Sequence, residues 1–204
     1  MSTMQNDTER AILTAAEQEF MLKGYGGART TAIAEKAGVT HAMLHYYYRT
    51  KDSLFNRIIE EKAAELLNQV LALFSTVEHT SFADKICHVV ERHFDMLVQN
   101  PLLPGFVLTE LRNNPERLEG WFTKIGDAVK MLAPDLQAEV ERVSAEGTIC
   151  HLPVQALLSD IVFLNISSVG FADVFCRIFG QDKDAYLEMR RKENVETIRK
   201  RLLP

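Results

Sequence analysis

The sequence contains few of the residues that mark disulfide-bonded, loop-rich or fibrous proteins. Its 204 residues include three cysteines, six prolines and ten glycines. Three scattered cysteines exclude a disulfide framework and a zinc cluster, so we interpret them as small buried side chains in a reducing compartment. Proline is absent from the first 100 residues, which leaves long helices unobstructed there.

A basic leader and a long uncharged run are also missing. The first six residues contain no basic side chain and no apolar run, so the sequence predicts no signal peptide. The most apolar stretch, residues 154–179, is interrupted by Asp160 and Asp173. The 12 residues between these two acids are fewer than the roughly 20 that a membrane span needs. We therefore expect a cytoplasmic protein that has no membrane partner.

The net charge of −5 is unevenly distributed. Residues 24–51 carry four basic side chains against one acidic one, whereas residues 52–204 have a net charge of −6. A small basic region attached to a larger acidic one suggests two roles. We therefore predict two domains, one of residues 1–51 and one of residues 52–204.

Apolar residues recur at helical spacing along the chain, and no stretch alternates as a strand does. The pattern predicts an all-α fold of about nine helices. Asn6 is expected to cap the first helix, with Glu9 completing a capping box. The expected helices cover residues 7–23, 31–37, 41–47, 51–74, 81–99, 103–113, 115–132, a further piece that Pro134 starts or kinks and that runs to about residue 146, then 153–179 and 182–203.

Residues 31–47 have the local signals of a helix-turn-helix. Gly38 is suited to end a short helix in the left-handed conformation, and Thr40 is suited to cap the next helix. Val39 and Leu44 flank this cap as a hydrophobic staple. Two short helices joined by a tight glycine turn are typical of a helix-turn-helix.

Three of the five tyrosines lie in this region, at positions 46–48. A recognition helix presents its first residues to base edges in the major groove. Tyrosine and threonine hydroxyls, and a lysine at a helix N-terminus, are natural phosphate ligands. A two-turn helix cannot bury three consecutive tyrosines. We therefore expect Tyr48 to be buried, with Tyr46 and Tyr47 at least partly outward.

Two linked runs carry a resemblance to a known family: Ile33-Ala34-x-x-Ala37-Gly38-Val39-Thr40, then Leu44-x-Tyr46-Tyr47-Tyr48-x-x-Lys51-x-x-Leu54. They resemble the DNA-binding signature of the TetR family of bacterial regulators. The signature covers about 50 N-terminal residues, and the rest of the chain resembles the family in helix count and layout. The resemblance implies a homodimeric repressor that binds a palindromic operator in double-stranded DNA. An unidentified small molecule would release it, and no cofactor is implied.

Carried over residue by residue, the resemblance implies two kinds of DNA contact. Two positions depart from the family pattern: many relatives carry Thr or Ser at residues 28 and 29, and tyrosine is common at residue 45. The implied base readers are His41, Ala42 and Met43. The implied backbone contacts are Thr30, Thr31, Thr40, His45, Tyr46, Tyr47 and Lys51.

The remainder of the chain is expected to hold the ligand. We predict a mostly apolar cavity of roughly 300–1,000 Å³ within residues 52–150. Each candidate wall residue could instead be an ordinary part of the core, and His93 could be a hydrogen-bonded core histidine. The candidates are His93, Phe106, Glu110, Trp121 and Phe122.

A dimer interface is expected near the C-terminus. Residues 154–179 are apolar on too many sides to be covered by one neighbour, so a symmetry mate is expected to cover the second side. Such an interface would bury on the order of 2,000 Å² or more. The candidate residues are Leu157, Ile161, Leu164, Phe171, Leu187, Val195, Ile198 and Leu202.

Other functions have weaker support in the sequence. His41 and His45 have a metal-ligand spacing, but no third ligand is evident, so we predict no metal site. Adjacent side chains on a helix point about 100° apart, which argues against catalysis by the neighbouring pairs Cys87-His88 and Cys150-His151. The chain is therefore predicted not to be an enzyme. An activator, a ligand-independent DNA-binding protein, and a helical enzyme or scaffold stay as alternatives.

Overall fold

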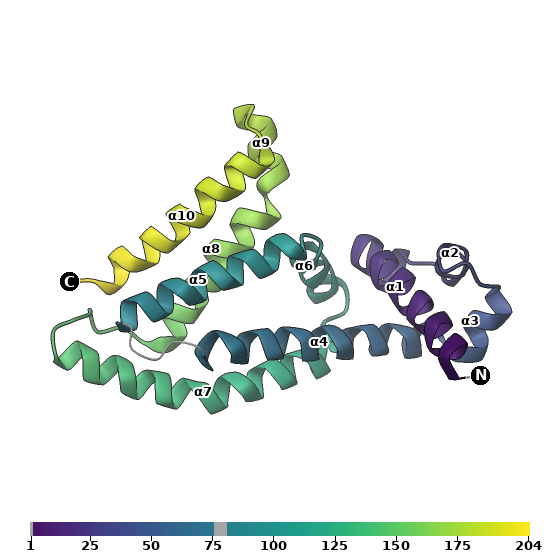
Figure 1. Ribbon diagram of the computed structural model, residues 1–204, viewed down its shortest axis with the longest axis horizontal. Helices are drawn as coiled ribbons and strands as arrows, with labels where there is room; N and C mark the ends of the chain where they lie inside the picture. Colours follow the sequence, from purple (N-terminus) through teal and green to yellow (C-terminus); the bar gives the residue numbers. More distant parts are fainter. Residues whose placement is uncertain (1, 76–80) are drawn as a thin grey trace. The chain divides into compact units, whose positions relative to one another are not determined.

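The computed structural model describes residues 2–75 and 81–204, which form ten α-helices, one 3₁₀ helix and no strand. The expected all-α class is confirmed. Figure 1 shows the order of the elements along the chain. They are α1 (Ser2–Gly27), α2 (Thr30–Lys36), α3 (His41–Tyr47), α4 (Lys51–Ser75), α5 (Phe82–Gln99), α6 (Leu103–Asn113), the 3₁₀ helix η1 (Pro115–Leu118), α7 (Glu119–Ala145), α8 (Val154–Gly170), α9 (Ala172–Phe179) and α10 (Lys183–Leu202).

The chain folds into two compact units. Unit 1 contains residues 1–66 and 105–125, and unit 2 contains residues 67–104 and 126–204. The segment that carries most of α6, all of η1 and the start of α7 therefore packs with the N-terminal helices. The functional division after residue 51 is a separate question and stays a prediction.

Unit 1 is built on the apolar face of α1. Ile12, Ala16 and Phe20 recur every four residues on that helix and are fully buried, as helical periodicity requires. Leu44 of α3 is buried as well, and Phe55 of α4 meets Phe20 edge to face with ring centroids 5.0 Å apart. Leu44 thus anchors α3 on this core, and five of the seven side chains of the helix are exposed.

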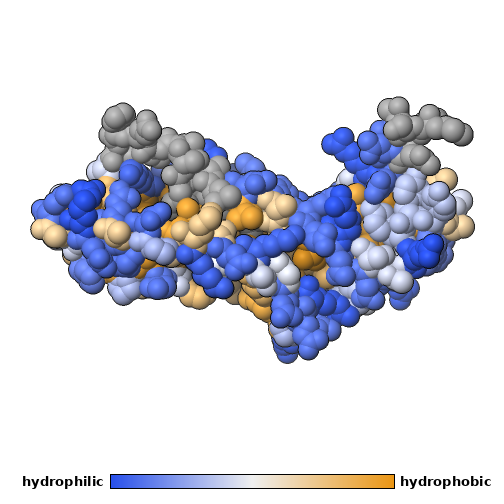
Figure 2. Space-filling view, turned by 90° about the horizontal axis from the view of Figure 1, so that it is seen from below, coloured by the Kyte–Doolittle hydropathy of each residue, from blue (hydrophilic) through white to orange (hydrophobic). Residues whose placement is uncertain are grey.

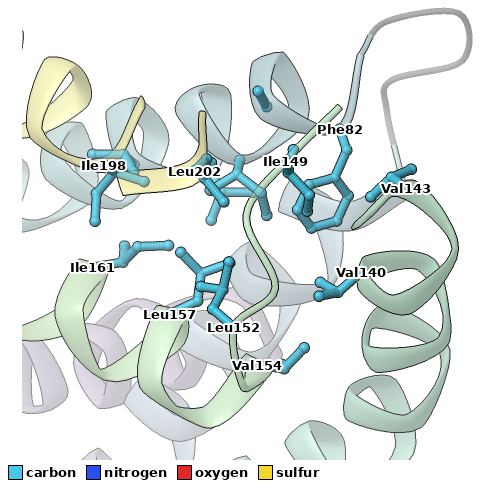
Figure 3. Packing of buried hydrophobic residues seen from close by; sticks show 14 residues of the cluster. Phe82, Val140, Val143, Ile149, Leu152, Val154, Leu157, Ile161, Ile198 and Leu202 are labelled. Atoms are coloured by element: carbon cyan, nitrogen blue, oxygen red, sulfur yellow. The ribbon is translucent and has the colours of Figure 1, made fainter. Parts of the chain in front are cut away.

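The core of unit 2 joins four helices and the connection that follows α7. Figure 3 shows these apolar side chains pointing toward one another from α5, α7, α8 and α10. Burying one such side chain fully stabilises the fold by roughly 1.5–3 kcal/mol. The labelled members are Phe82, Val140, Val143, Ile149, Leu152, Val154, Leu157, Ile161, Ile198 and Leu202.

A polar network crosses the same unit. The Asn165 amide nitrogen lies 3.1 Å from Nδ1 of His93, and the Asn194 amide donates to Oδ1 of Asn165 at 2.9 Å. Arg190 donates to Oδ1 of Asn194 at 2.7 Å and to the Ser168 hydroxyl at 3.2 Å. Buried polar groups that are satisfied in this way fix a unique packing. The network therefore sets the register of α5, α8 and α10.

One face of the molecule is mainly hydrophilic. Figure 2 shows hydrophilic residues over most of one face, with hydrophobic residues reaching it in limited areas. In unit 2, Arg191 pairs with Asp95 at 2.8 Å and Arg199 pairs with Asp84 at 2.8 Å. Exposed pairs of this kind contribute only about 0–1 kcal/mol each. The apolar core and the polar network therefore stabilise the packing of α10 on α5 more than these pairs do.

The capping box predicted at the start of the first helix is wrong. The helix begins at Ser2, so Asn6 lies inside it. Glu9 is used differently, because its carboxylate accepts a hydrogen bond from the Tyr48 hydroxyl at 3.0 Å. The Glu9 carboxylate, which the local pattern assigned to the cap, thus bonds to a residue 39 positions away in sequence.

Pro134 does not start a separate helix, because α7 runs through it from Glu119 to Ala145. Proline removes one hydrogen bond inside a helix. The residue is exposed, and on the solvent side of a helix water can take the place of that bond. The exposed position of Pro134 therefore allows the helix to continue through a proline that the sequence pattern marked as a helix start or kink.

The long helix predicted for residues 153–179 is broken in two. It ends at Gly170, and α9 begins at Ala172 at an angle of 57°. Gly180 then closes α9 in the left-handed conformation, with φ of 64°. No single helix among the described residues is long and apolar enough to cross a membrane, although the bent pair α8–α9 reaches the required length and composition together.

Candidate nucleic-acid interface

The turn between α2 and α3 has the predicted geometry. Gly38 adopts φ of 68°, a conformation that is strained for any residue with a side chain. The side chain of Thr40 accepts a hydrogen bond from the backbone N–H of Met43 at 3.1 Å, which satisfies one free donor at the start of α3. The predicted bounds of this helix and its cap are therefore confirmed.

The outward side of α3 consists of the residues expected to contact DNA. His41, Ala42, Met43, His45 and Tyr46 are exposed, with 76% of the Tyr46 surface accessible. Their neighbour Leu44 is buried in unit 1. The helix thus presents two imidazoles, a thioether and a phenol on one surface. Imidazole and phenol groups can both donate and accept hydrogen bonds.

The three consecutive tyrosines separate as predicted. Tyr48 is buried, whereas Tyr47 is half-buried and meets the exposed Tyr46 ring edge to face at 5.6 Å between centroids. Burial, with the hydrogen bond to Glu9, raises the pKa of Tyr48 to about 12. Tyr48 is therefore a structural residue, and Tyr46 is the tyrosine of this run that is exposed.

Hydrogen bonds within the protein orient both histidines of α3. Nε2 of His41 lies 3.0 Å from the hydroxyl of Thr30, and Nδ1 of His45 lies 3.3 Å from the carbonyl oxygen of Arg49. A carbonyl only accepts, so Nδ1 of His45 is the donor in that bond. The other ring nitrogen of each residue is left for an external partner. The two rings also pack edge to face, with centroids 4.4 Å apart.

The other implied backbone contacts lie around α3. Thr31 and Thr40 are exposed and Thr30 is half-buried. Lys51, at the start of α4, holds its Nζ atom 4.4 Å from the centre of the Tyr25 ring. Partial burial, followed by the nearby charge of Arg117, lowers the pKa of Lys51.

Among the residues that the structure describes, no three or more His, Cys, Asp or Glu side chains are grouped so that they could hold a metal ion. His41 and His45 instead have Thr30 and the Arg49 carbonyl as partners. The arrangement on α3 therefore supports hydrogen bonding to an external surface.

The five candidate ligand-wall residues are divided between the two units. His93 belongs to unit 2, where it bonds to Asn165, and burial lowers its pKa to about 4. The other four belong to unit 1: Phe106 and Trp121 are buried, Phe122 is 42% exposed, and Glu110 is only 2% exposed. Trp121 and Phe122 stack with centroids 5.9 Å apart.

Two of these residues have informative polar contacts. The carboxylate of Glu110 accepts a hydrogen bond from the backbone N–H of Tyr25 at 2.7 Å. The indole N–H of Trp121 is buried and has no hydrogen-bond partner among the described residues. Local sequence patterns do not reveal the contact made by Glu110, because its partner Tyr25 lies 85 residues away along the chain.

The candidate dimer residues fall into two groups. Leu157, Ile161, Ile198 and Leu202 are core members of unit 2, and Leu164 and Val195 pack against that core. The first four are thus already covered by their own chain and are not free for a partner. Leu187 is half-buried, and Phe171 is 53% exposed.

A second set of apolar side chains, at Phe171 and on α9, is exposed. Phe171 begins what we name the apolar strip, which continues along α9. The strip borders a groove of about 720 Å³ that Ser168, Tyr186 and Arg190 also line. Its members are Phe171, Val174, Phe175, Ile178 and Phe179, each at least 39% exposed.

Comparison with known proteins gives consistent matches. Residues 12–58 match the family model described as "Bacterial regulatory proteins, tetR family". Over 137 residues, the chain is 26% identical to the HTH-type transcriptional regulator YdgC of Bacillus subtilis, a match that covers 65% of this chain and 66% of YdgC. The chain thus spans just under two thirds of that relative.

Solved structures with the same fold cover nearly the whole chain. A TetR family transcription regulator of Marinobacter aquaeolei has a TM-score of 0.65 and 16% identity, covering 96% of this chain and 97% of that one. The regulator FadR of Bacillus subtilis, solved in complex with stearoyl-CoA, has a TM-score of 0.60 and 19% identity, covering 92% and 97%. At these identities the likeness shows a shared fold.

Proposed function

We infer that this chain is a member of the TetR family of bacterial regulatory proteins, because its residues 12–58 match the model of that family. We propose that it is a cytoplasmic transcriptional regulator: a homodimeric repressor that binds a palindromic operator and is released by a small molecule. The observation that carries the proposal is the exposed side of α3. Its imidazoles and phenol lie on a helix whose N-terminus is capped and whose inner face is fixed by Leu44.

In this mechanism α3 enters the major groove, and its first residues meet base edges. His41, Ala42 and Met43 are the base readers. Around them, hydroxyl, imidazole and ammonium groups bind phosphate oxygens and fix the register of the protein on the duplex. These backbone contacts are Thr30, Thr31, Thr40, His45, Tyr46, Tyr47 and Lys51.

Dimerisation uses the apolar strip rather than the buried residues of α8 and α10. Five large apolar side chains exposed together form the kind of patch that marks an interaction site, and a second copy of the chain is the occupant that the operator symmetry requires. The two recognition helices of such a dimer must reach successive major grooves, about 34–36 Å apart.

The ligand, in this proposal, has an apolar body and a hydrogen-bond acceptor. A buried donor without a partner needs an explanation, and the indole N–H of Trp121 is such a donor beside the stacked Phe122. FadR binds stearoyl-CoA, so long-chain acyl-CoA is the first probe. Release requires that the ligand bind the DNA-free conformation more tightly, and the coupling is reciprocal.

The test is retardation of a DNA fragment from upstream of the protein's own gene, with a polyanion competitor present. The wild-type protein is expected to retard the fragment at concentrations that leave an unrelated fragment free. Tyr46→Ala should weaken binding, whereas Leu22→Ala, which changes an exposed residue of α1, should not. Equal binding to both fragments would leave only charge attraction and would overturn the proposal.

Adding stearoyl-CoA to the retarded complex then tests the ligand. Release of the DNA by the acyl-CoA, but not by free coenzyme A, supports an apolar ligand. Trp121→Phe removes the N–H and keeps the aromatic ring, so it should weaken release without changing DNA binding. If no acyl-CoA releases the DNA, the ligand belongs to another class, while the DNA-binding result stands by itself.

A further inference from the structure

The last turn of α1 is held by a residue from far along the chain. Gly24 has φ of 66° and ψ of 174°, which breaks the regular helix just before Tyr25. The backbone N–H of Tyr25 then donates to Oε1 of Glu110, on α6, at 2.7 Å. A Cβ atom at position 24 would lie 3.1 Å from the same oxygen. Glycine is therefore required both for the backbone turn and for the close approach of the carboxylate.

Glu110 is a buried carboxylate in a specific setting. Only 2% of its surface is accessible, and a buried carboxylate is stable only with hydrogen bonds or opposite charges around it. The Tyr25 N–H supplies the hydrogen bond. Lys51 supplies charge, because Glu110 is among the groups that act to raise the pKa of that lysine, against the larger lowering by burial and Arg117.

Tyr25 connects this carboxylate to the DNA-contacting residue Lys51. Its ring lies 4.4 Å from Nζ of Lys51 and 3.7 Å from the guanidinium carbon of Arg117. Its hydroxyl donates to Oδ1 of Asp52 at 2.7 Å. Cations held against an aromatic face have a preferred position. The place of the ring therefore decides where the ammonium group of Lys51 lies.

We propose that Glu110 is a positioning residue for DNA binding: by holding the Tyr25 backbone, it places the Tyr25 ring and through it the Lys51 ammonium group. This inference rests on the proposed function, since it concerns the same DNA surface. It extends that surface beyond residues 1–51, because Glu110 and Arg117 both lie in the segment of residues 105–125 that packs in unit 1.

A positioning role for Glu110 and a purely structural role change different properties of the protein. A structural role would change the folded fraction and leave the folded protein with all of its phosphate contacts. A positioning role removes the Lys51 contact from folded protein. Each phosphate contact contributes about 0.9 to the slope of log affinity against log salt concentration, so the slope reports the contact directly.

The experiment measures binding of the upstream DNA fragment over a range of salt concentrations, beside thermal unfolding, for wild type, Glu110→Gln, Glu110→Ala and Glu110→Asp. Glu110→Gln keeps an acceptor oxygen and should bind within about threefold of wild type. Glu110→Ala should bind at least tenfold more weakly, with a slope smaller by about 2 for the two subunits of a dimer. Glu116→Ala, an exposed carboxylate of η1, is the matched control and should behave as wild type.

If Glu110→Ala does not fold, Glu110→Asp replaces it, because the shorter side chain keeps the charge but does not reach the Tyr25 N–H. Its affinity and slope should also fall. Variants that lose affinity only in proportion to their unfolded fraction, with an unchanged slope, would overturn the inference while leaving the proposed function intact. Wild-type protein that does not bind the fragment would instead overturn the proposed function and this inference with it.

Discussion

Thr30 is the first residue of α2 and His41 is the first residue of α3. The Thr30 hydroxyl lies 3.0 Å from Nε2 of His41, and this contact joins the two helices. One of these residues is proposed to bind the DNA backbone and the other a base edge. With Nε2 engaged, Nδ1 is the ring nitrogen of His41 left for a further hydrogen bond. The pair therefore couples a sequence-independent contact to a sequence-dependent one.

This coupling predicts that Thr30 and His41 act as a unit in DNA binding. Thr30→Val and His41→Ala should each weaken operator binding, and the double variant should lose less than the sum of the two. We expect an interaction energy of about 0.5–1.5 kcal/mol, the usual net value of one hydrogen bond. Affinities of all four proteins for the same fragment provide this cycle. Additive losses would mean that the contact is absent from the complex.

The structure of α3 could be predicted because its signals are local. Gly38, Thr40 and Leu44 act within a few residues of one another, and the turn, the cap and the burial of Leu44 all follow from them. The exposed residues of α3 could be predicted for the same reason, since a short helix with one buried face leaves the others outside.

The remaining features depend on contacts that are distant in sequence. Glu9 leaves its expected cap for Tyr48, and Glu110 bonds to the backbone at Tyr25. Neither partner is visible in a local pattern. Leu157 and Ile198 show the same limit, because periodicity identifies an apolar face but does not say whether the same chain or a second copy covers it.

His45 predicts a DNA affinity that depends on pH. Its Nδ1 donates to the Arg49 carbonyl, which leaves Nε2 facing outward, and only the protonated ring can donate from that atom as well. A phosphate close to Nε2 favours the charged form of the ring, in which both nitrogens donate. Affinity should therefore rise as the pH falls from about 8 to 6.

The two histidines of α3 are distinguished by substitution. The pH dependence should shrink in His45→Gln and persist largely in His41→Gln, because the helix dipole opposes positive charge in the first turn. Binding curves measured at constant ionic strength between pH 6 and 8 provide the comparison. Parallel curves for wild type and His45→Gln would show that this histidine is not a phosphate ligand.

His93 is expected to lower the free energy of unfolding of the protein in mild acid. Burial lowers its pKa to about 4 from an ordinary value of 6.5, so below pH 6.5 the unfolded chain binds a proton that the folded chain does not. Stability contributed by this group is present above pH 6.5 and decreases as the pH falls toward 4. The full difference is about 3 kcal/mol, and no further loss from this group occurs below that range.

Chemical denaturation of wild type and His93→Gln at several pH values between 4 and 7 measures this effect. Glutamine offers an acceptor for the Asn165 amide and does not titrate, so the variant should lose stability less steeply over this range. His151→Gln, at an exposed position, controls for the removal of a histidine and should follow wild type. Identical slopes for wild type and His93→Gln would contradict the assignment.

The apolar strip predicts where the dimer can be separated without unfolding the chain. Ile178 is 66% exposed in α9, so Ile178→Asp should leave the fold of the chain intact while placing a charge in the proposed interface. We expect a monomer in sedimentation at micromolar concentration, an unchanged helical content, and weaker operator binding because each monomer holds only one recognition helix.

Two further variants separate the interface from the core. Met131→Asp changes a residue of α7 that is 65% exposed and lies outside the strip, and it should stay dimeric. Leu157→Ala removes a side chain that is fully buried within its own chain, so it should lower the free energy of unfolding by about 2–5 kcal/mol. At temperatures where Leu157→Ala is folded, it should still sediment as a dimer. If Leu157→Ala dissociates and Ile178→Asp does not, the interface lies on the other face of α8.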